Sequence, residues 1–435
     1  MFERSPKGEN ALLVQPYAGT ADPGRLEEFA ELARSAGATV VGTVTAKIGR
    51  RNPAHYIGTG KLEEVRLLCE ANGADLVLFN IELSPVQERN LEKALGRRVV
   101  DRTGLILDIF AMRAQSHEGK LQVELAQLRH MATRLIRGWT HLERQRGGSI
   151  GLRGPGETQL ETDRRLLQKR VEQLEKRLEK VEVQRTQMRR ARLRNELPRV
   201  ALVGYTNAGK STLFNVLTTS KVYVADQLFA TLDPTVRRVE GLPCGPLVLS
   251  DTVGFVRDLP HDLVAAFRST LSEARDADLL LHVVDASDPA CDERIGQVDE
   301  VLAHIGAGDI PQILVYNKID LIEGAAPRRE RPAEGTEKLR VSARSGEGLE
   351  LLRDAISERF AMQRVQGELR LPSRSARLRS RLHALGAVSQ EIADEDGWRL
   401  QLELPRTQAV QLAAEAGGDA LEPLLAAPGA PTYNP

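Results

Sequence analysis

Aromatic side chains and net charge are both scarce in this chain. Only 4% of its 435 residues are Phe, Trp or Tyr, which argues against an aromatic platform that stacks the bases of single-stranded nucleic acid. Sixty basic residues balance sixty acidic ones, so no overall field draws the protein to RNA or to a membrane. Any polyanion would have to be bound by a local basic patch.

Paired cysteines and long apolar runs are also missing. Cys69, Cys244 and Cys291 are far apart, and neither they nor the eight histidines have the spacing of metal ligands, which is typical of a reducing compartment. The N-terminus has no apolar core like that of a signal peptide, and no run approaches the roughly 20 apolar residues that span a bilayer. We therefore expect a cytoplasmic protein without a membrane span.

The length predicts two to four domains, and the composition changes along the chain at three places. Residues 1–117 alternate helical and strand patterns, which predicts a small N-terminal α/β domain. Residues 118–196 read as long helices, and residues 197–365 as a regular β-α alternation with loops at Pro311 and at 324–335. Residues 366–435 predict a small C-terminal α+β segment with a strand near Trp398 and a disordered Ala/Pro-rich tail.

Two apolar seams predict an antiparallel helical hairpin. Apolar residues recur at spacings of three and four from Leu121 to Leu135 and again from Leu160 to Val181. Between these seams, residues 147–156 contain five glycines and one proline, which are poor residues for continuing a helix. The pattern therefore predicts two long helices joined by a glycine-rich tip.

A phosphate-binding motif opens the third segment. It follows an apolar strand and leads into a helix, which is the context that G-x-x-x-x-G-K-[ST] requires. Backbone N–H groups would surround the phosphates, Lys210 would reach the β- and γ-phosphates, and the Ser211 hydroxyl would bind Mg²⁺. The predicted contacts are Gly204, Tyr205, Thr206, Asn207, Ala208, Gly209, Lys210, Ser211 and Thr212.

Three further motifs follow in order, each at the end of a predicted strand. The first comprises Asp251, Thr252, Val253 and Gly254. Its acid can bind Mg²⁺ through water, and its glycine N–H can contact the γ-phosphate. The second, whose Asp320 carboxylate can accept the N1 and N2 donors of guanine, is Asn317, Lys318, Ile319 and Asp320. The third, which would lie behind the guanine with the Ala343 N–H aimed at O6, is Ser342, Ala343 and Arg344. Together they predict a GTP site at the carboxyl ends of a doubly wound, mainly parallel sheet.

These four motifs resemble those of TRAFAC-type GTPases. The resemblance implies a threonine that completes the Mg²⁺ shell, in the predicted contact segment Phe229, Ala230, Thr231, Leu232 and Asp233. Obg-like relatives carry a Thr-Leu pair there, which favours Thr231 over Thr235 as a metal ligand beside Ser211. Lys210, Thr231 and Gly254 are then the catalytic candidates. Ras-like enzymes orient water with a glutamine where this chain has Phe255, so we expect slow unassisted hydrolysis.

Several stretches resemble the HflX family specifically. The signature 151–165, which begins Gly-Leu-Arg-Gly-Pro-Gly, lies at the predicted hairpin tip. The upstream stretches 56–61, 100–103 and 113–126 are also similar to that family. The resemblance covers at least residues 56–360.

Membership of that family implies a GTP hydrolase that binds the large ribosomal subunit, ribosomal RNA included, and that dissociates or rescues stalled ribosomes. Candidate phosphate contacts are Arg153, Arg164 and Arg165. A ribosome-assembly role and an ATP- or GTP-driven RNA-remodelling role remain open. The sequence does not decide whether the N-terminal domain, with its Gly58-x-Gly60-Lys61 turn, binds ATP. We expect a monomer with GTP or GDP and Mg²⁺ as its ligands.

Overall fold

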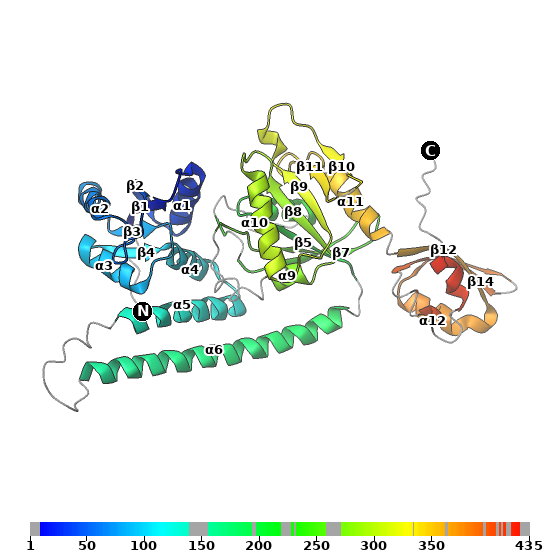
Figure 1. Cartoon of the computed structure of the whole chain (residues 1–435). Helices are drawn as coiled ribbons and strands as arrows, with labels where there is room; N and C mark the ends of the chain where they lie inside the picture. The colour runs from blue at the N-terminus through cyan, green and yellow to red at the C-terminus, as the bar shows by residue number, and fades with distance from the viewer. Residues whose placement is uncertain are drawn as a thin grey trace.

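The computed structural model contains three sheets and a long helical hairpin, coloured by position along the chain in Figure 1. It describes residues 9–138, 155–193, 197–218, 228–229, 232–257, 271–333, 335–361, 364–394, 397–405, 409, 412–414 and 419–426. The predicted fold class is confirmed: an α/β domain, a hairpin, a mainly parallel P-loop domain and a small C-terminal α+β unit follow in that order.

The N-terminal domain is a four-stranded parallel sheet of order β2-β1-β3-β4 with helices on it. The helical and strand patterns of residues 1–117 do not reveal its first strand or its last two helices. Helix α3 begins at a capping box in which Ser84 and Gln87 satisfy each other's backbone N–H groups. The elements are β1 (Asn10–Tyr17), α1 (Pro23–Ser35), β2 (Thr39–Lys47), α2 (Thr59–Asn72), β3 (Leu76–Phe79), α3 (Pro85–Leu95), β4 (Arg98–Asp101) and α4 (Arg102–Arg113).

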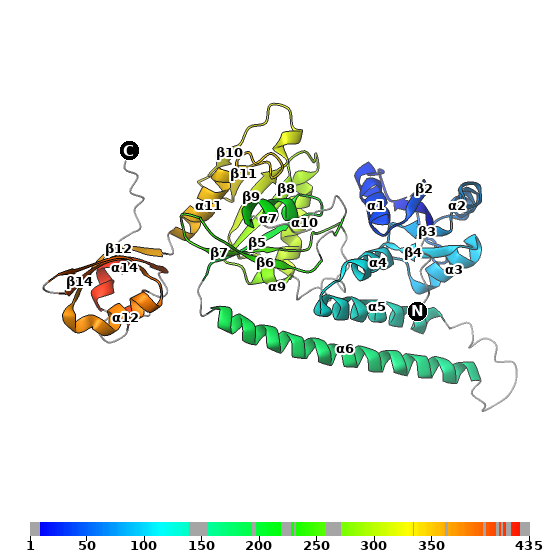
Figure 2. The same cartoon turned by 180° about the vertical axis from the view of Figure 1, so that it is seen from behind.

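The hairpin consists of α5 (His117–Gly138) and α6 (Pro155–Leu193). Both views show the helices side by side, with α5 between α6 and the N-terminal domain (Figures 1 and 2). The two predicted seams meet in one apolar cluster, and Arg129 pairs with Glu175 across the helices at 2.7 Å. The cluster comprises Leu121, Leu125, Leu128, Val171, Leu174 and Leu178.

The predicted C-terminal boundary of the glycine-rich tip is wrong by two residues. Pro155 and Gly156 are the first residues of α6, because proline fits the first turn of a helix, where its missing N–H would have no intrahelical partner. Residues 147–154 of the tip, with Arg153 among them, lie outside the described residues.

The third segment forms a seven-stranded sheet of order β10-β11-β9-β8-β5-β7-β6, in which only β6 and β10 run antiparallel to their neighbours. We call it the G domain. The predicted loop at 324–335 is wrong at Arg328–Glu330, where β10 pairs with β11 at the sheet edge although its sequence has no apolar pattern. Its strands are β5 (Arg199–Gly204), β6 (Thr235–Val239), β7 (Leu247–Asp251), β8 (Leu279–Asp285), β9 (Gln312–Asn317), β10 and β11 (Glu337–Arg340). Its helices are α7 (Lys210–Thr218), α9 (Ser272–Arg275), α10 (Cys291–His304), η2 (Ile319–Leu321) and α11 (Leu349–Ala361).

The C-terminal unit follows α11 at the end of the molecule farthest from the N-terminal domain (Figure 1). Its antiparallel sheet has the order β12-β14-β13, and a separate apolar core lies beneath it. The elements are β12 (Arg364–Pro372), η3 (Ser373–Ser375), α12 (Ala376–Ala384), β13 (Val388–Asp394), β14 (Gly397–Pro405), η4 (Asp419–Leu421) and α14 (Glu422–Ala426). The predicted disordered tail, residues 427–435, lies outside the described residues.

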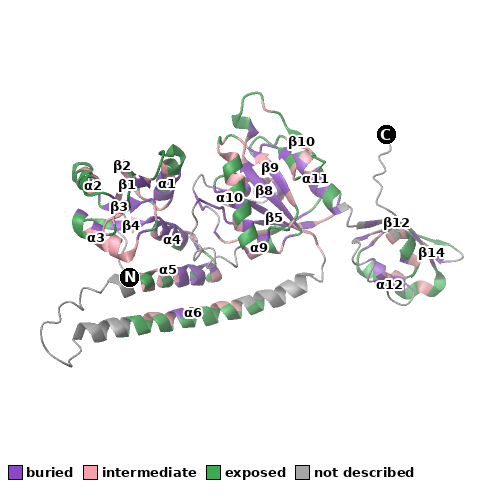
Figure 3. Ribbon diagram, in the orientation of Figure 1, coloured by how far each residue is buried: buried purple, intermediate pink, exposed green. Residues whose placement is uncertain are grey.

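One hydrophobic cluster belongs to two domains at once. Phe29 and Phe110 of the N-terminal domain share it with Tyr205, Phe229 and Phe255 of the G domain. The buried residues of α4 and of the G-domain sheet stand out in Figure 3. The domains are therefore joined through the residues that surround the predicted nucleotide site.

Candidate functional site

The phosphate-binding loop lies between β5 and α7, as predicted. Lys210 is buried, and its ammonium donates hydrogen bonds to the carbonyls of Gly204 at 3.1 Å and Tyr205 at 2.7 Å. Burial lowers the pKa of Lys210 to about 8, although the Asp251 carboxylate opposes that shift. Gly204 has φ 144°, and a Cβ on it would lie 2.2 Å from the Val283 carbonyl oxygen, so only glycine fits there.

The second motif lies beside this loop at the end of β7. The Ser211 hydroxyl donates to Asp251 at 2.7 Å, and Thr252 fixes the strand end by donating to the Leu202 carbonyl at 2.6 Å. A Cβ on Gly254 would lie 2.8 Å from both Lys210 Nζ and Thr206 Cα, which excludes any side chain at that position. The structure therefore places Ser211, Asp251 and Gly254 beside Lys210, whereas Thr231, the other predicted Mg²⁺ ligand, lies outside the described residues.

The two remaining motifs lie at the ends of β9 and β11. Asn317 donates from its amide to the Ala208 carbonyl at 2.9 Å and accepts the Ala343 N–H at 2.8 Å. It thus links the phosphate loop to the predicted guanine end. Because this structure engages the Ala343 N–H within the protein, its contact with guanine O6 stays a prediction.

The predicted base-selecting carboxylate is oriented by a neighbour. The Ser342 hydroxyl donates to Asp320 at 2.6 Å, and Asp320 is itself exposed at the protein surface. Lys318 pairs with Asp285 at 2.7 Å. A carboxylate held in this way can accept two parallel N–H donors, which is the pattern that guanine presents.

The predicted threonine segment is described only in part, because Ala230 and Thr231 lie outside the described residues. Phe229 packs edge-to-face on Phe110 with ring centroids 4.6 Å apart, and Leu232 is buried. Asp233 accepts the backbone N–H groups of Gln115 and Ser116, which directly precede α5. In this structure these side chains contact the N-terminal domain and the hairpin, so their predicted contact with nucleotide stays a prediction.

Phe255 occupies the position where Ras-like enzymes have glutamine. Its backbone continues the phosphate loop, since its carbonyl accepts the Thr206 N–H at 2.8 Å and its N–H donates to Gly204 at 3.2 Å. The ring is 98% buried in the core that both domains share. It holds the loop in place and offers no polar group to a water molecule.

A buried polar network that no sequence pattern predicts joins the two domains. Tyr205 donates its phenol to Glu28 and accepts the Arg257 N–H at 2.7 Å. Arg102 donates to Glu28 at 2.6 Å and to the Arg257 carbonyl at 2.8 Å. Burial and the neighbouring Glu28 carboxylate raise the pKa of Tyr205 far above its ordinary value, so the phenol keeps its proton. The one sequence signal was that Arg102 lies in the family-like stretch 100–103.

Arg257, three residues after Gly254, is anchored by carboxylates of two domains. Its guanidinium pairs with Asp22 at 2.7 Å and with Glu293 at 3.4 Å. The backbone that follows the γ-phosphate motif is thus fixed to the N-terminal domain through side chains that only the fold brings together.

The candidate RNA contacts Arg164 and Arg165 are both exposed on α6. Arg344 is also exposed, and it directly follows Ala343 of the predicted guanine-binding motif. No described helix combines the length and the apolar character that crossing a bilayer requires.

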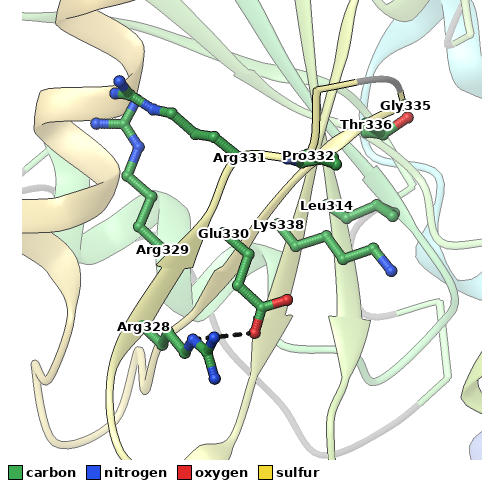
Figure 4. A pocket seen from close by; sticks show the side chains of 9 residues that line it. All are labelled: Leu314, Arg328, Arg329, Glu330, Arg331, Pro332, Gly335, Thr336 and Lys338. Carbon is green, nitrogen blue, oxygen red and sulfur yellow. Dashed lines mark ion pairs between the residues drawn. The ribbon is translucent and has the colours of Figure 1, made fainter.

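An open hollow at the edge of the G-domain sheet does not contain these motifs (Figure 4). Arginines and a lysine of β10 and β11 line it. Arg328 pairs with Glu330 at 3.3 Å, Arg329 with Glu358 at 3.0 Å and Arg331 with Glu337 at 3.1 Å. Since acids neutralise these arginines, we assign the hollow no ligand.

Comparisons with known proteins identify the family. Residues 24–111 match the family model "GTP-binding GTPase N-terminal", residues 113–192 match "GTP-binding GTPase Middle Region", and residues 199–318 match "50S ribosome-binding GTPase". A GTP-binding protein of Sulfolobus solfataricus, solved in complex with GDP, is 25% identical with a TM-score of 0.44, over 81% of this chain and 98% of that one.

Curated relatives match nearly the whole chain. GTPase HflX of Escherichia coli is 54% identical, over 93% of this chain and 96% of that protein. GTPase HflX of Caldanaerobacter subterraneus is 48% identical, over 93% of each chain. The four nucleotide motifs meet at one end of the sheet and the similarity extends through the N-terminal domain and hairpin, so this chain belongs to the HflX family of GTPases and hydrolyses GTP.

Proposed function

We propose that this GTPase binds the large ribosomal subunit through its hairpin and uses GTP to separate stalled ribosomes into subunits. The observation that carries the proposal is the shape and charge of α6. This helix has 39 residues, which corresponds to roughly 58 Å, and eleven of them are basic against seven acidic. A thin basic arm of this length can enter a channel walled by RNA, where a globular domain cannot.

Further support comes from the G domain, whose matching family model is named for binding to the 50S subunit. A ribosomal partner also explains how an enzyme with Phe255 in place of a catalytic glutamine reaches a useful rate, since the partner can supply the missing transition-state contacts. In this proposal the protein acts in the cytoplasm as a monomer.

Mg²⁺ is the metal that we propose for the site. The donor set fits it, because a serine hydroxyl is a hard oxygen ligand and a carboxylate can hold a metal-bound water. The Ser211 hydroxyl at the start of α7 lies 2.7 Å from the Asp251 carboxylate at the end of β7. Thr231 is the proposed third protein group. The ion would neutralise charge on the phosphates, while Lys210 and the Gly254 N–H bind their oxygens.

Incubation of the protein with intact 70S ribosomes and GTP, followed by sedimentation, tests the proposal. We expect free subunits to accumulate with GTP and the large subunit to accelerate hydrolysis by roughly tenfold or more. Binding to large subunits without release of subunits from intact ribosomes would instead indicate an assembly factor. If neither intact ribosomes nor large subunits bind, the ribosomal proposal is wrong.

A charge reversal on α6 tests the role of the hairpin. Arg164→Glu with Arg165→Glu should weaken binding to the large subunit by roughly tenfold or more at low salt, and the deficit should shrink as salt rises. The matched control reverses Arg374 and Arg377, two exposed arginines of the C-terminal unit, and should bind like wild type. Equal weakening in both variants would show only a general effect of charge.

A further inference from the structure

The carboxylate of Asp233, in the threonine segment, binds the two residues that directly precede hairpin helix α5. It accepts the N–H groups of Gln115 and Ser116, both at 2.8 Å, and it also binds the Ser116 hydroxyl. The two partners are 118 and 117 residues away in sequence. This contact therefore connects the segment with the predicted metal-binding threonine to the base of the hairpin.

The hairpin side of the contact is built to hold an anion. Ser116 caps α5, since its hydroxyl accepts the Gly119 N–H at 2.9 Å and its carbonyl accepts the Lys120 N–H at 3.0 Å. The unpaired N–H groups and the dipole at a helix N-terminus favour negative charge, so the Asp233 carboxylate is stabilised where it lies.

Gly119 makes this close approach possible. A Cβ on Gly119 would lie 2.5 Å from Asp233 Oδ1 and 3.0 Å from the Ser116 hydroxyl. No side chain fits there unless the carboxylate moves. Glycine is otherwise a poor residue in a helix, by about 1 kcal/mol relative to alanine. The contact with Asp233 explains why glycine occupies this position.

The same segment is held at further points by the N-terminal domain. The Leu228 N–H donates to Ser35 at 3.1 Å, and Phe229 packs on Phe110. Asp233 lies two residues after Thr231 in the sequence, and two residues span at most roughly 7 Å. Thr231 itself lies outside the described residues, and only this short stretch of chain separates it from Asp233.

We propose that Asp233, held by Ser116 and Gly119, is a positioning residue for GTP hydrolysis that links the hairpin to the nucleotide site. The contact fixes the threonine segment in the arrangement that hydrolysis needs, and a displacement of α5 changes that arrangement. Binding of a partner to the hairpin and the state of the nucleotide are then coupled through this contact. The identity of that partner and the metal-binding role of Thr231 rest on the proposed function.

Single-turnover GTP hydrolysis by the purified full-length protein, without ribosomes, tests this inference. We expect each of three variants to lower the rate constant by roughly fivefold or more: Asp233→Asn, Ser116→Ala and Gly119→Ala. Fivefold corresponds to about 1 kcal/mol, the free energy that the loss of a helix-cap hydrogen bond typically costs. Affinity for GDP should stay within about twofold, because GDP lacks the γ-phosphate that this segment serves. Ser116→Thr keeps the hydroxyl and should retain most of the wild-type rate.

Gly119→Ala is the decisive variant, since alanine strengthens the helix and every polar group of the contact remains. Gly60→Ala is its matched control, because a Cβ on Gly60, in α2, meets nothing within 4 Å. The Asp233→Asn and Ser116→Ala effects should not add in the double variant, as expected for one shared contact. A rate that is unchanged or raised in Gly119→Ala, or an equal loss of GDP affinity in that variant, would overturn the proposal and leave the ribosomal proposal untouched.

Discussion

The phenol of Tyr205 donates a hydrogen bond to the carboxylate of Glu28, across 177 positions of sequence and from one domain to another. Tyr205 belongs to the phosphate-binding loop, and Glu28 to the first helix of the N-terminal domain. Arg102 pairs with the same carboxylate, so a buried charge lies directly behind the loop. The N-terminal domain is thus a structural part of the nucleotide site.

This relationship predicts the effect of Tyr205→Phe. The change leaves the Arg257 N–H without its acceptor and removes one donor from Glu28, and both groups are buried. We expect the free energy of unfolding to fall by about 1–3 kcal/mol in denaturant titrations. Tyr17→Phe, at a half-buried strand end, should change it by less than about 0.5 kcal/mol. Similar losses in both variants would argue against the network.

Base choice should depend on Asp320. Asp320→Asn should change the preferred nucleotide from GTP to xanthosine triphosphate, because an amide can donate to the O2 of xanthine but cannot accept both guanine donors. The loss of GTP affinity should be about 3 kcal/mol or more, measured with fluorescent nucleotides. Asp354→Asn, on the exposed face of α11, is the control. Unchanged GTP affinity in the Asp320 variant would refute the assignment.

Nucleotide binding should take up protons near pH 8. Burial lowers the pKa of Lys210 to about 8 in the free protein, whereas phosphates stabilise the charged ammonium in the complex. Binding should therefore take up roughly 0.1 proton at pH 7 and roughly 0.5 at pH 8, so affinity falls as the pH rises through this range. Calorimetric titration with GDP in buffers of different ionisation enthalpy measures the uptake. A value independent of pH would contradict the lowered pKa.

The stability of the hairpin should depend on the apolar side chains packed between α5 and α6. Leu174 is fully buried between α5 and α6, so Leu174→Ala should lower the free energy of unfolding by about 3 kcal/mol. Leu166→Ala, on the same helix and 58% exposed, removes the same atoms and should have little effect. Thermal unfolding followed by circular dichroism compares the two. If both variants melt alike, α6 does not pack as described.

The sequence alone was enough to predict the four nucleotide-binding motifs. Gly204–Ser211, Asp251–Gly254, Asn317–Asp320 and Ser342–Ala343 could be predicted because each motif is short, local and placed at the end of a strand. The seams of α5 and α6 could be predicted for a similar reason, since helical periodicity repeats over many residues. Strand β10 could not, because it is only three residues long, Arg328–Glu330, and all three are charged, so no apolar alternation marks it in the sequence.

What holds the site in place was decided by the tertiary structure. Glu28, Arg102 and Arg257 meet behind Tyr205, and Asp233 meets Ser116 and Gly119, across separations of about 50 to 230 residues. A lone Glu or Gly on a predicted helix is ordinary in sequence, and its role appears only when packing removes it from water beside a distant partner. The sequence by itself determined a GTPase with a helical arm. The packing of two domains and the hairpin against the nucleotide loops, which depends on long-range burial and charge pairing, was decided by the fold.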